Sequence, residues 1–286
     1  MSRRAAVLGH PIGHSKSPAL HLAAYAELGD EIDYSAIDVT EESLPAFMAS
    51  VRGDQRWCGL SVTMPLKKAM VREVDEIRGV ARVLGVINTV VFDGEGASRR
   101  RIGYNTDVAG IVNALRNAGA AEAPAAAVLG GGGTAAAAVA ALQELGAASV
   151  DVYVRDTGRA AEARAAARGL AMDIAVRPMT EAVSGMLAAD VVISTLPPRA
   201  ADGMAGELEG LGVTTEGVLL DVAYDPWPSR IAAAWQKGGG KVVPGLEMLL
   251  YQAVEQVRYF TGREDAVSTE VIDVMCDSVG APRRVF

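Results

Sequence analysis

The chain has 286 residues, 50% of them hydrophobic and 22% charged, which is enough to bury the cores of two domains of ordinary size. Its formal net charge of −8 argues against nucleic acid or an anionic membrane as a partner. The two cysteines, Cys58 and Cys276, are far apart without a Cys-x-x-Cys spacing, which indicates reduced thiols rather than a disulfide or zinc framework. No apolar run suits a signal peptide or a membrane span, so we expect a cytoplasmic protein.

The first part of the chain alternates short apolar strands with helical patterns, which is typical of a parallel α/β architecture. We expect a helix at 17–29 ended by Gly29, a helix at 41–51, and strands at 4–9, 32–39 and 57–63. The strands at 85–92 and 99–105 should form a hairpin through the turn "DGEG".

A second α/β series begins near Thr106. It opens with a helix at 107–119, and a long amphipathic helix at 246–262 closes it. Between them we expect strands at 126–129, 149–154, 172–176, 190–195, 217–222 and 241–245, separated by helices. The break near residue 106 therefore predicts two α/β units.

The segment "VLGGGGTAAAA" places Gly130-x-Gly132-x-x-Ala135 directly after a strand and at the opening of a helix. Glycines there allow a tight turn and close backbone approach, and the helix start offers free N–H groups to a pyrophosphate. A flexible alanine and glycine connector is the alternative. The following strand completes a βαβ unit and favours a dinucleotide site.

The tip of that following strand should select the dinucleotide. An acidic residue there binds the ribose 2′-hydroxyl of NAD, whereas arginine favours the 2′-phosphate of NADP. The sequence "VYVRDTGRAAEA" places Arg155 at the tip and Arg159 four residues later, which predicts NADP. Asp156 could repel that phosphate or bind a hydroxyl instead, and Arg159 could simply decorate an exposed helix.

Several polar residues sit where strands end and helices begin. A lysine, Lys67, follows a buried strand and Pro65, where an ammonium group suggests a function. Ser15 and Ser17 precede a helix and could hold a carboxylate, although Ser17 could also be an ordinary N-cap. Asn88 lies in an apolar strand and needs a hydrogen-bond partner, and Asp107 starts a helix.

Three histidines, His10, His14 and His21, raise the possibility of a metal site. Pro11 and Gly13 interrupt any helical face, and no neighbouring thiol or carboxylate completes a ligand set. We therefore expect no metal.

These motifs together resemble the shikimate dehydrogenase family. The segments "HPIGHSKSP", "SVTMPLKK", "GVINT", "YNTD", "VLGGGGTA", "YVRDTGRA" and "GLEMLLYQA" follow the family's order and spacing over essentially the whole chain. The family often has Asn-Arg-Thr where this chain has Val154-Arg155-Asp156. The resemblance implies reversible NADPH-dependent reduction of 3-dehydroshikimate to shikimate, a step towards chorismate and the aromatic amino acids.

The resemblance also implies roles for individual residues. Lys67 and Asp107 would be the catalytic pair. The implied substrate-binding residues are Ser15 and Ser17 for the carboxylate, Thr63, Asn88 and Gln252 for the ring hydroxyls, and Tyr224 nearby. The implied cofactor-binding residues are Gly130, Gly132, Gly133, Thr134, Ala135, Arg155, Arg159, Gly245 and Met248.

For the domains, the resemblance implies a substrate-binding catalytic domain made of residues 1–107 and 245–286. Residues 108–244 would form a Rossmann-type NADP-binding domain, with a cleft between the two. The expected partner is a small-molecule substrate, and the chain would act as a monomer or homodimer without nucleic acid or membrane. A quinate or aminoshikimate dehydrogenase using NAD(P) is the nearest alternative. A non-catalytic dinucleotide sensor and a folate-type dehydrogenase are more distant ones.

Overall fold

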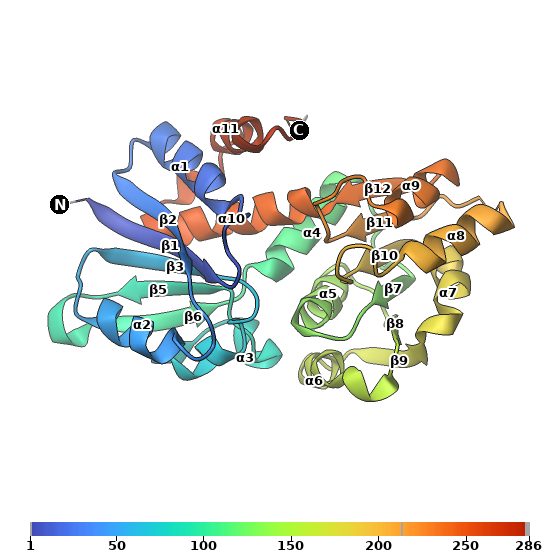
Figure 1. Cartoon of the computed structure of the whole chain (residues 1–286), viewed down its shortest axis with the longest axis horizontal. Coiled ribbons are helices and arrows are strands. Elements are labelled where there is room, and N and C mark those ends of the chain that lie inside the picture. Colours follow the sequence, from blue (N-terminus) through green and yellow to red (C-terminus); the bar gives the residue numbers. More distant parts are fainter. Residues whose placement is uncertain (1, 213, 284–286) are drawn as a thin grey trace. The chain divides into compact units, whose positions relative to one another are not determined.

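The computed structural model describes residues 2–212 and 214–283. The chain divides into two compact units, residues 1–106 with 252–286 and residues 107–251 (Figure 1). The predicted substrate domain also included residue 107 and residues 245–251, which here group with the second unit. The reason is that α10 (Gly245–Thr261) is one continuous helix, and the boundary falls inside it rather than at its start.

The first unit contains a six-stranded sheet in the order β2-β1-β3-β5-β6-β4. The strands are β1 (Arg3–Gly9), β2 (Ile32–Asp38), β3 (Trp57–Val62), β4 (Glu76–Ile77), β5 (Thr89–Asp93) and β6 (Arg100–Tyr104). The sheet is mixed: β1 is parallel to β2 and β3, whereas β5 is antiparallel to β3 and β6. The expected hairpin is confirmed, and it is the reason the sheet is not purely parallel, since a short turn can join only antiparallel strands.

Helices complete this unit. They are α1 (Ser17–Leu28), α2 (Leu44–Arg52), α3 (Ala81–Leu84), the second half of α10, and α11 (Thr269–Val279). Helix α1 ends where Gly29 adopts a left-handed conformation (φ 67°), as its sequence predicts. Fully buried side chains such as Leu8, Met48 and Leu60 form a core that includes residues of β1, β3 and α2.

The second unit contains a six-stranded, fully parallel sheet in the order β12-β11-β10-β7-β8-β9. Its strands are β7 (Ala126–Leu129), β8 (Ser149–Val154), β9 (Asp173–Pro178), β10 (Val191–Ser194), β11 (Val218–Asp221) and β12 (Lys241–Pro244). The first strand, β7, lies between β8 and β10, so the chain reverses direction across the sheet there. That switch point is where doubly wound sheets bind dinucleotides, at the carboxyl ends of the strands.

Helices cover both faces of this sheet. They are α4 (Asp107–Asn117), α5 (Gly133–Glu144), α6 (Ala161–Gly169), α7 (Ala182–Ala188), α8 (Asp202–Leu211) and α9 (Arg230–Lys237). Figure 1 shows α5 and α6 on one face and α7, α8 and α9 on the other. Across the described residues, none of the helices combines the length and hydrophobicity that a membrane crossing requires.

Candidate functional site

Lys67 lies in a turn just after β3, and backbone hydrogen bonds fix this segment. The N–H of Thr63 donates to the carbonyl of Leu8 at 2.9 Å, and the carbonyl of Lys67 accepts from the N–H of Ile87 at 2.9 Å. The side chain of Lys67 is half-buried, whereas that of Lys68 is exposed. The backbone of Lys67 is therefore held directly by the segment before β5, and Thr63 ties the start of the same turn to β1.

Ser15 and Ser17 are neighbours in space at the start of α1. The N–H of Ser17 donates to Ser15 Oγ at 3.3 Å. The helix begins at Ser17, so the capping position belongs to Lys16, which makes no side-chain cap. The alternative of Ser17 as an ordinary N-cap is therefore wrong. Ser17 is buried and lies within hydrogen-bonding reach of Tyr34, whose phenol pKa is raised by burial and lowered in part by this contact.

Asn88 is buried immediately before β5, one residue earlier than its expected place inside the strand. Its Oδ1 accepts from the N–H of Thr106 at 2.7 Å, and its Nδ2 donates to Thr106 Oγ1 at 2.9 Å. The Nδ2 also lies 3.5 Å from Oε1 of Gln252, a residue of α10. The fold thus brings together two of the predicted substrate-binding residues, although 164 positions separate them in sequence.

Asp107 is the first residue of α4, and its side chain is buried. A carboxylate in the first turn is stabilised by the partial positive charge of the helix start. It directly follows Thr106, so its backbone is anchored by the hydrogen bond that Thr106 donates to Asn88. The structure therefore supports the predicted location of this carboxylate at a helix start.

Gly130 requires the absence of a side chain for two reasons. Its φ of 115° lies in the region that favours glycine, and a Cβ on it would overlap Thr195 Oγ1. The carbonyl of Leu129 accepts the hydroxyl hydrogen of Thr195 at 2.8 Å, which holds that threonine in place. The turn after β7 is therefore tight and passes directly beside the end of β10.

The three residues after Gly132 begin helix α5. Gly132 itself occupies the capping position and supplies no side-chain cap to the N–H groups of Gly133 and Thr134. A Cβ on Gly132 would meet only Glu162 Oε2, at 4.0 Å, so there is room beside this glycine, and Ala135 is fully buried. Free N–H groups, open space and a small buried residue are what a pyrophosphate-binding turn needs, so these residues fit a dinucleotide.

Arg155 and Arg159 are exposed just after β8. Within the described part of the chain, neither guanidinium makes an ion pair or a side-chain hydrogen bond. Asp156, their acidic neighbour, uses Oδ1 to accept the N–H of Gly158 at 2.9 Å and so caps the following turn. That local bond gives Asp156 a structural use that explains its presence between two arginines.

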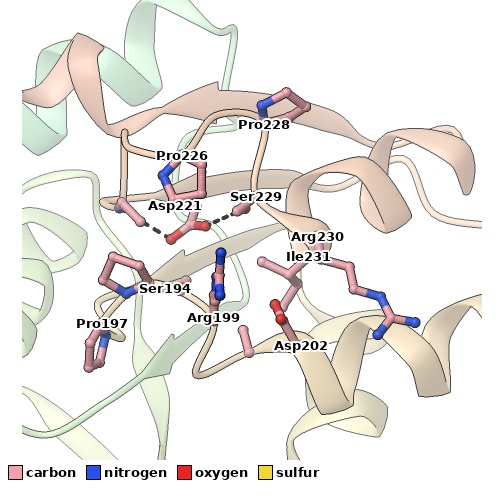
Figure 2. A pocket seen from close by; sticks show the side chains of 13 residues that line it. Ser194, Pro197, Arg199, Asp202, Asp221, Pro226, Pro228, Ser229, Arg230 and Ile231 are labelled. Atoms are coloured by element: carbon pink, nitrogen blue, oxygen red, sulfur yellow. Dashed lines mark hydrogen bonds between the residues drawn. The ribbon is translucent and has the colours of Figure 1, made fainter.

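Tyr224 lies on a loop, residues 222–228, whose two ends are held by one carboxylate. Asp221 Oδ2 accepts the hydroxyl of Ser229 at 2.6 Å, and Oδ1 accepts the N–H of Ala223 at 3.3 Å (Figure 2). Burial raises the pKa of Asp221. Tyr224 is half-buried, and its pKa is raised by burial and by the nearby Asp225. The loop is thus anchored although most of its residues are exposed.

A cavity of about 190 Å³ lies between the carboxyl ends of β10 and β11 and the starts of α8 and α9 (Figure 2). Ser194, Arg199, Asp202 and Asp221 line it. Of its described lining residues, none belongs to the predicted substrate or cofactor set. The cavity is therefore separate from the residues that the sequence singles out.

Gly245 and Met248 lie in the first turn of α10, in the second unit. A Cβ on Gly245 would overlap the carbonyl of Val222. The backbone at this helix start therefore packs directly against the backbone of the segment after β11, which only glycine permits. Met248, three residues later, is buried.

His10 and His21 have hydrogen-bond partners among the protein side chains. His10 Nδ1 lies 2.7 Å from Asp38 Oδ1, and His21 is fully buried. Among the described residues, no three histidine, cysteine, aspartate or glutamate side chains are grouped so as to hold a metal ion.

Sequence reasoning missed the hydrogen-bonded network of buried polar side chains near Asn88, although it named His21 as a metal candidate. They are His21, Tyr34, Ser61, Thr106 and Gln256. Helical spacing offered a signal, since His21 is four residues after Ser17 and Gln256 four residues after Gln252, which places each pair on one helix face.

Two family models match parts of the chain. The model described as the shikimate dehydrogenase substrate binding domain matches residues 7–90. The model described as the shikimate 5'-dehydrogenase C-terminal domain matches residues 245–265.

Relatives match nearly the whole chain. A shikimate dehydrogenase (NADP(+)) of Methanothermobacter thermautotrophicus is 34% identical over 96% of this chain and 94% of its own length. The crystal structure of Mycobacterium tuberculosis shikimate dehydrogenase is 38% identical, with a TM-score of 0.83 over 97% of this chain and 98% of that one. A Thermus thermophilus shikimate 5-dehydrogenase solved with NADP(H) and shikimate is 30% identical, with a TM-score of 0.78 over 96% and 99% of the two chains.

Proposed function

This chain belongs to the shikimate dehydrogenase family, and from that membership we propose how its residues carry out the reaction. The reaction is the reversible, NADP-dependent interconversion of 3-dehydroshikimate and shikimate, a step of the shikimate pathway. One observation carries this conclusion: whole-length relatives at 34–36% identity are shikimate dehydrogenases (NADP(+)).

Lys67 is the residue that stabilises the charge developing on the substrate. NADPH, when bound, supplies the hydride that reduces the ring carbonyl. An ammonium group at the carbonyl oxygen offsets the negative charge that forms there and donates the proton that completes the hydroxyl. The backbone bond between Lys67 and Ile87 supports this role, because it fixes the position from which the side chain extends. Asp107, the other catalytic residue, is the carboxylate that interacts with a substrate hydroxyl.

Ser15 and Ser17 bind the substrate carboxylate. Their closeness at the start of α1 supports this, since two hydroxyls and a helix start together favour a negative charge. Thr63, Asn88 and Gln252 bind the ring hydroxyls, and Tyr224 contacts the substrate. The donor Nδ2 of Asn88 and the acceptor Oε1 of Gln252, 3.5 Å apart, supply the two kinds of group that a hydroxyl pairs with.

The second unit holds the cofactor. Residues Gly130, Gly132, Gly133, Thr134 and Ala135 form the pyrophosphate turn. Arg155 and Arg159 bind the 2′-phosphate that distinguishes NADP from NAD, and their exposed guanidinium groups support this. Gly245 and Met248 lie beside the nicotinamide. NADP binding is thus assigned to the second unit, and substrate binding mainly to the first, with Asp107 and Tyr224 contributed by the second.

The chain is proposed to act in the cytoplasm as a monomer or homodimer. Its only required partners are then the small-molecule substrate and NADP.

The test is a comparison of kcat/KM for shikimate and quinate, each with NADP and with NAD. The proposal predicts the highest kcat/KM for shikimate with NADP. A higher value for quinate with NAD would assign the chain to quinate oxidation instead.

A further inference from the structure

Gln256 lies on α10, one turn after Gln252, and its side chain is almost completely buried. Its Nε2 is 3.1 Å from the backbone carbonyl of Asn88. A carbonyl oxygen can only accept, so the NH₂ end of the Gln256 amide must face Asn88. The backbone carbonyl of Asn88 therefore fixes the orientation of this amide.

The other end of the amide faces two donors. Ser61 Oγ donates to Gln256 Oε1 at 2.7 Å, and His21 Nε2 lies 3.2 Å from the same oxygen. Burial lowers the pKa of His21 to about 3, so its ring is neutral and carries one proton. Because Oε1 only accepts, that proton is on Nε2, and Nδ1 accepts the hydroxyl of Tyr25 at 3.0 Å.

A relay of hydrogen bonds runs from Gln256 to the side chain of Asn88. Gln256 Nε2 donates to Thr89 Oγ1 at 3.0 Å, and Thr89 Oγ1 donates to Asn88 Oδ1 at 2.8 Å. The N–H of Thr106 donates to the same Oδ1 at 2.7 Å. Two donors at Oδ1 leave only one orientation of the Asn88 amide, in which Nδ2 lies on the side of Thr106 Oγ1 and Gln252.

We propose that Gln256 is a positioning residue for substrate binding: through Thr89 it sets the amide of Asn88 so that Nδ2, a donor, meets a substrate hydroxyl. The inference rests on the proposed function, in which Asn88 binds such a hydroxyl. If the relay were broken, Oδ1 would lose the hydroxyl donor of Thr89 and keep the N–H of Thr106, so the Asn88 amide would be held less firmly in the orientation that presents Nδ2. Binding of the hydroxyl would then lose its preorganised partner.

The test uses variants that break the relay without adding charge. Gln256→Met keeps the length of the side chain and removes the amide, and Thr89→Val removes the hydroxyl at constant shape. Steady-state kinetics with shikimate and NADP should show KM for shikimate raised about tenfold in each variant, with KM for NADP within about twofold. Thr89→Ser, which keeps the hydroxyl, should restore KM towards the wild-type value.

The matched control is Tyr25→Phe. It deletes the bond from Tyr25 to His21, which belongs to the same buried network but does not touch the amide of Gln256. It should lower thermal stability while leaving KM for shikimate unchanged. If Tyr25→Phe raises KM as much as Gln256→Met does, general loosening of the network explains the effect and the inference fails.

A double-mutant cycle with Asn88→Ala separates the inference from the function on which it rests. If Gln256 acts through Asn88, Gln256→Met should raise KM no further in the Asn88→Ala background. If the effects of Gln256→Met and Asn88→Ala on KM for shikimate simply multiply, the positioning role is wrong, whereas the substrate role of Asn88 stands. The same conclusion follows if Gln256→Met and Thr89→Val both fold and keep the wild-type KM. If Asn88→Ala itself leaves KM for shikimate unchanged, the substrate role of Asn88 is wrong, and the inference falls with it.

Discussion

Gly130 and Thr195 lie so close together that a single Cβ on the glycine would overlap the threonine hydroxyl oxygen. The contact joins the turn after β7 to the end of β10. These two strands are neighbours and flank the switch point of the second sheet. Gly132, two residues later, has room for a Cβ, which would meet only Glu162 Oε2, at 4.0 Å. The two glycines thus differ: close packing requires Gly130, whereas Gly132 has room for a methyl group and is proposed to adjoin the cofactor.

This difference predicts distinct phenotypes for two alanine substitutions. Gly130→Ala should lower the free energy of unfolding by about 2 kcal/mol or more, because of its φ and the overlap, and should weaken NADP binding as well. Gly132→Ala should change stability by less than about 1 kcal/mol, yet weaken NADP binding, because its methyl group fills space that the pyrophosphate needs. Urea unfolding and NADP titration measure both effects. Normal NADP affinity in Gly132→Ala would exclude this turn from the cofactor site.

Arg155→Ala and Arg159→Ala should each weaken the binding of NADP and leave the binding of NAD nearly unchanged. Loss of a charged hydrogen bond to the 2′-phosphate should raise KM for NADP about 10- to 100-fold. KM for NAD should stay within about threefold, because NAD has no phosphate at that position. Arg164→Ala, which removes an exposed charge from α6, is the control and should leave both values unchanged. Equal effects on the two cofactors would remove the arginines from cofactor selection.

Ser15→Ala should mainly raise KM for shikimate, by about tenfold, because it deletes one of the two hydroxyls proposed to bind the carboxylate. A shikimate analogue with a neutral group in place of the carboxylate should bind both enzymes equally weakly. Ser50→Ala, an exposed change on α2 in the same unit, serves as the control. An unchanged KM in Ser15→Ala would show that this serine does not contact the carboxylate.

The buried His21 should make stability depend on pH. Burial lowers its pKa from 6.5 to about 3, so below pH 6.5 the unfolded chain takes up a proton that the folded chain does not. The free energy of unfolding should therefore fall as pH decreases from 6.5 towards 3, by about 2 kcal/mol between pH 7 and pH 5 from this group.

His21→Phe preserves a ring at this position, where the imidazole stacks on Tyr34 with ring centroids 4.0 Å apart, and removes the titration. Urea unfolding of both proteins between pH 5 and pH 8 tests the assignment. Plotted against pH, the free energies of unfolding of the two proteins should run parallel above pH 7 and converge or cross below it. Curves that stay parallel down to pH 5 would mean that His21 is protonated in the folded protein.

Local signals in the sequence predicted much of this fold. Helix α1 and its end at Gly29, the hairpin of β5 and β6, and the glycine turn before α5 all depend on residues within one or two turns of each other. Such features follow from backbone preferences and periodicity, and they were confirmed.

Other features depend on contacts between distant segments, which periodicity does not encode. The carbonyl of Asn88 meets Gln256 although 168 positions separate them, and no local pattern marks that pairing. The same holds for the boundary inside α10, since a regular helix gives no sign of where its contacts change from one unit to the other.

The proposal depends most on Lys67 as the cation and proton donor in the reduction of 3-dehydroshikimate, and as the acceptor of that proton in the oxidation of shikimate. The most direct measurement is the initial rate of shikimate-dependent NADPH formation by the wild-type protein, Lys67→Ala and Lys68→Ala. We predict turnover by the wild type, a kcat lowered by about 10²–10⁴ with KM comparatively unaffected in Lys67→Ala, and wild-type behaviour in Lys68→Ala. A Lys67→Ala protein that keeps the wild-type kcat would contradict the account.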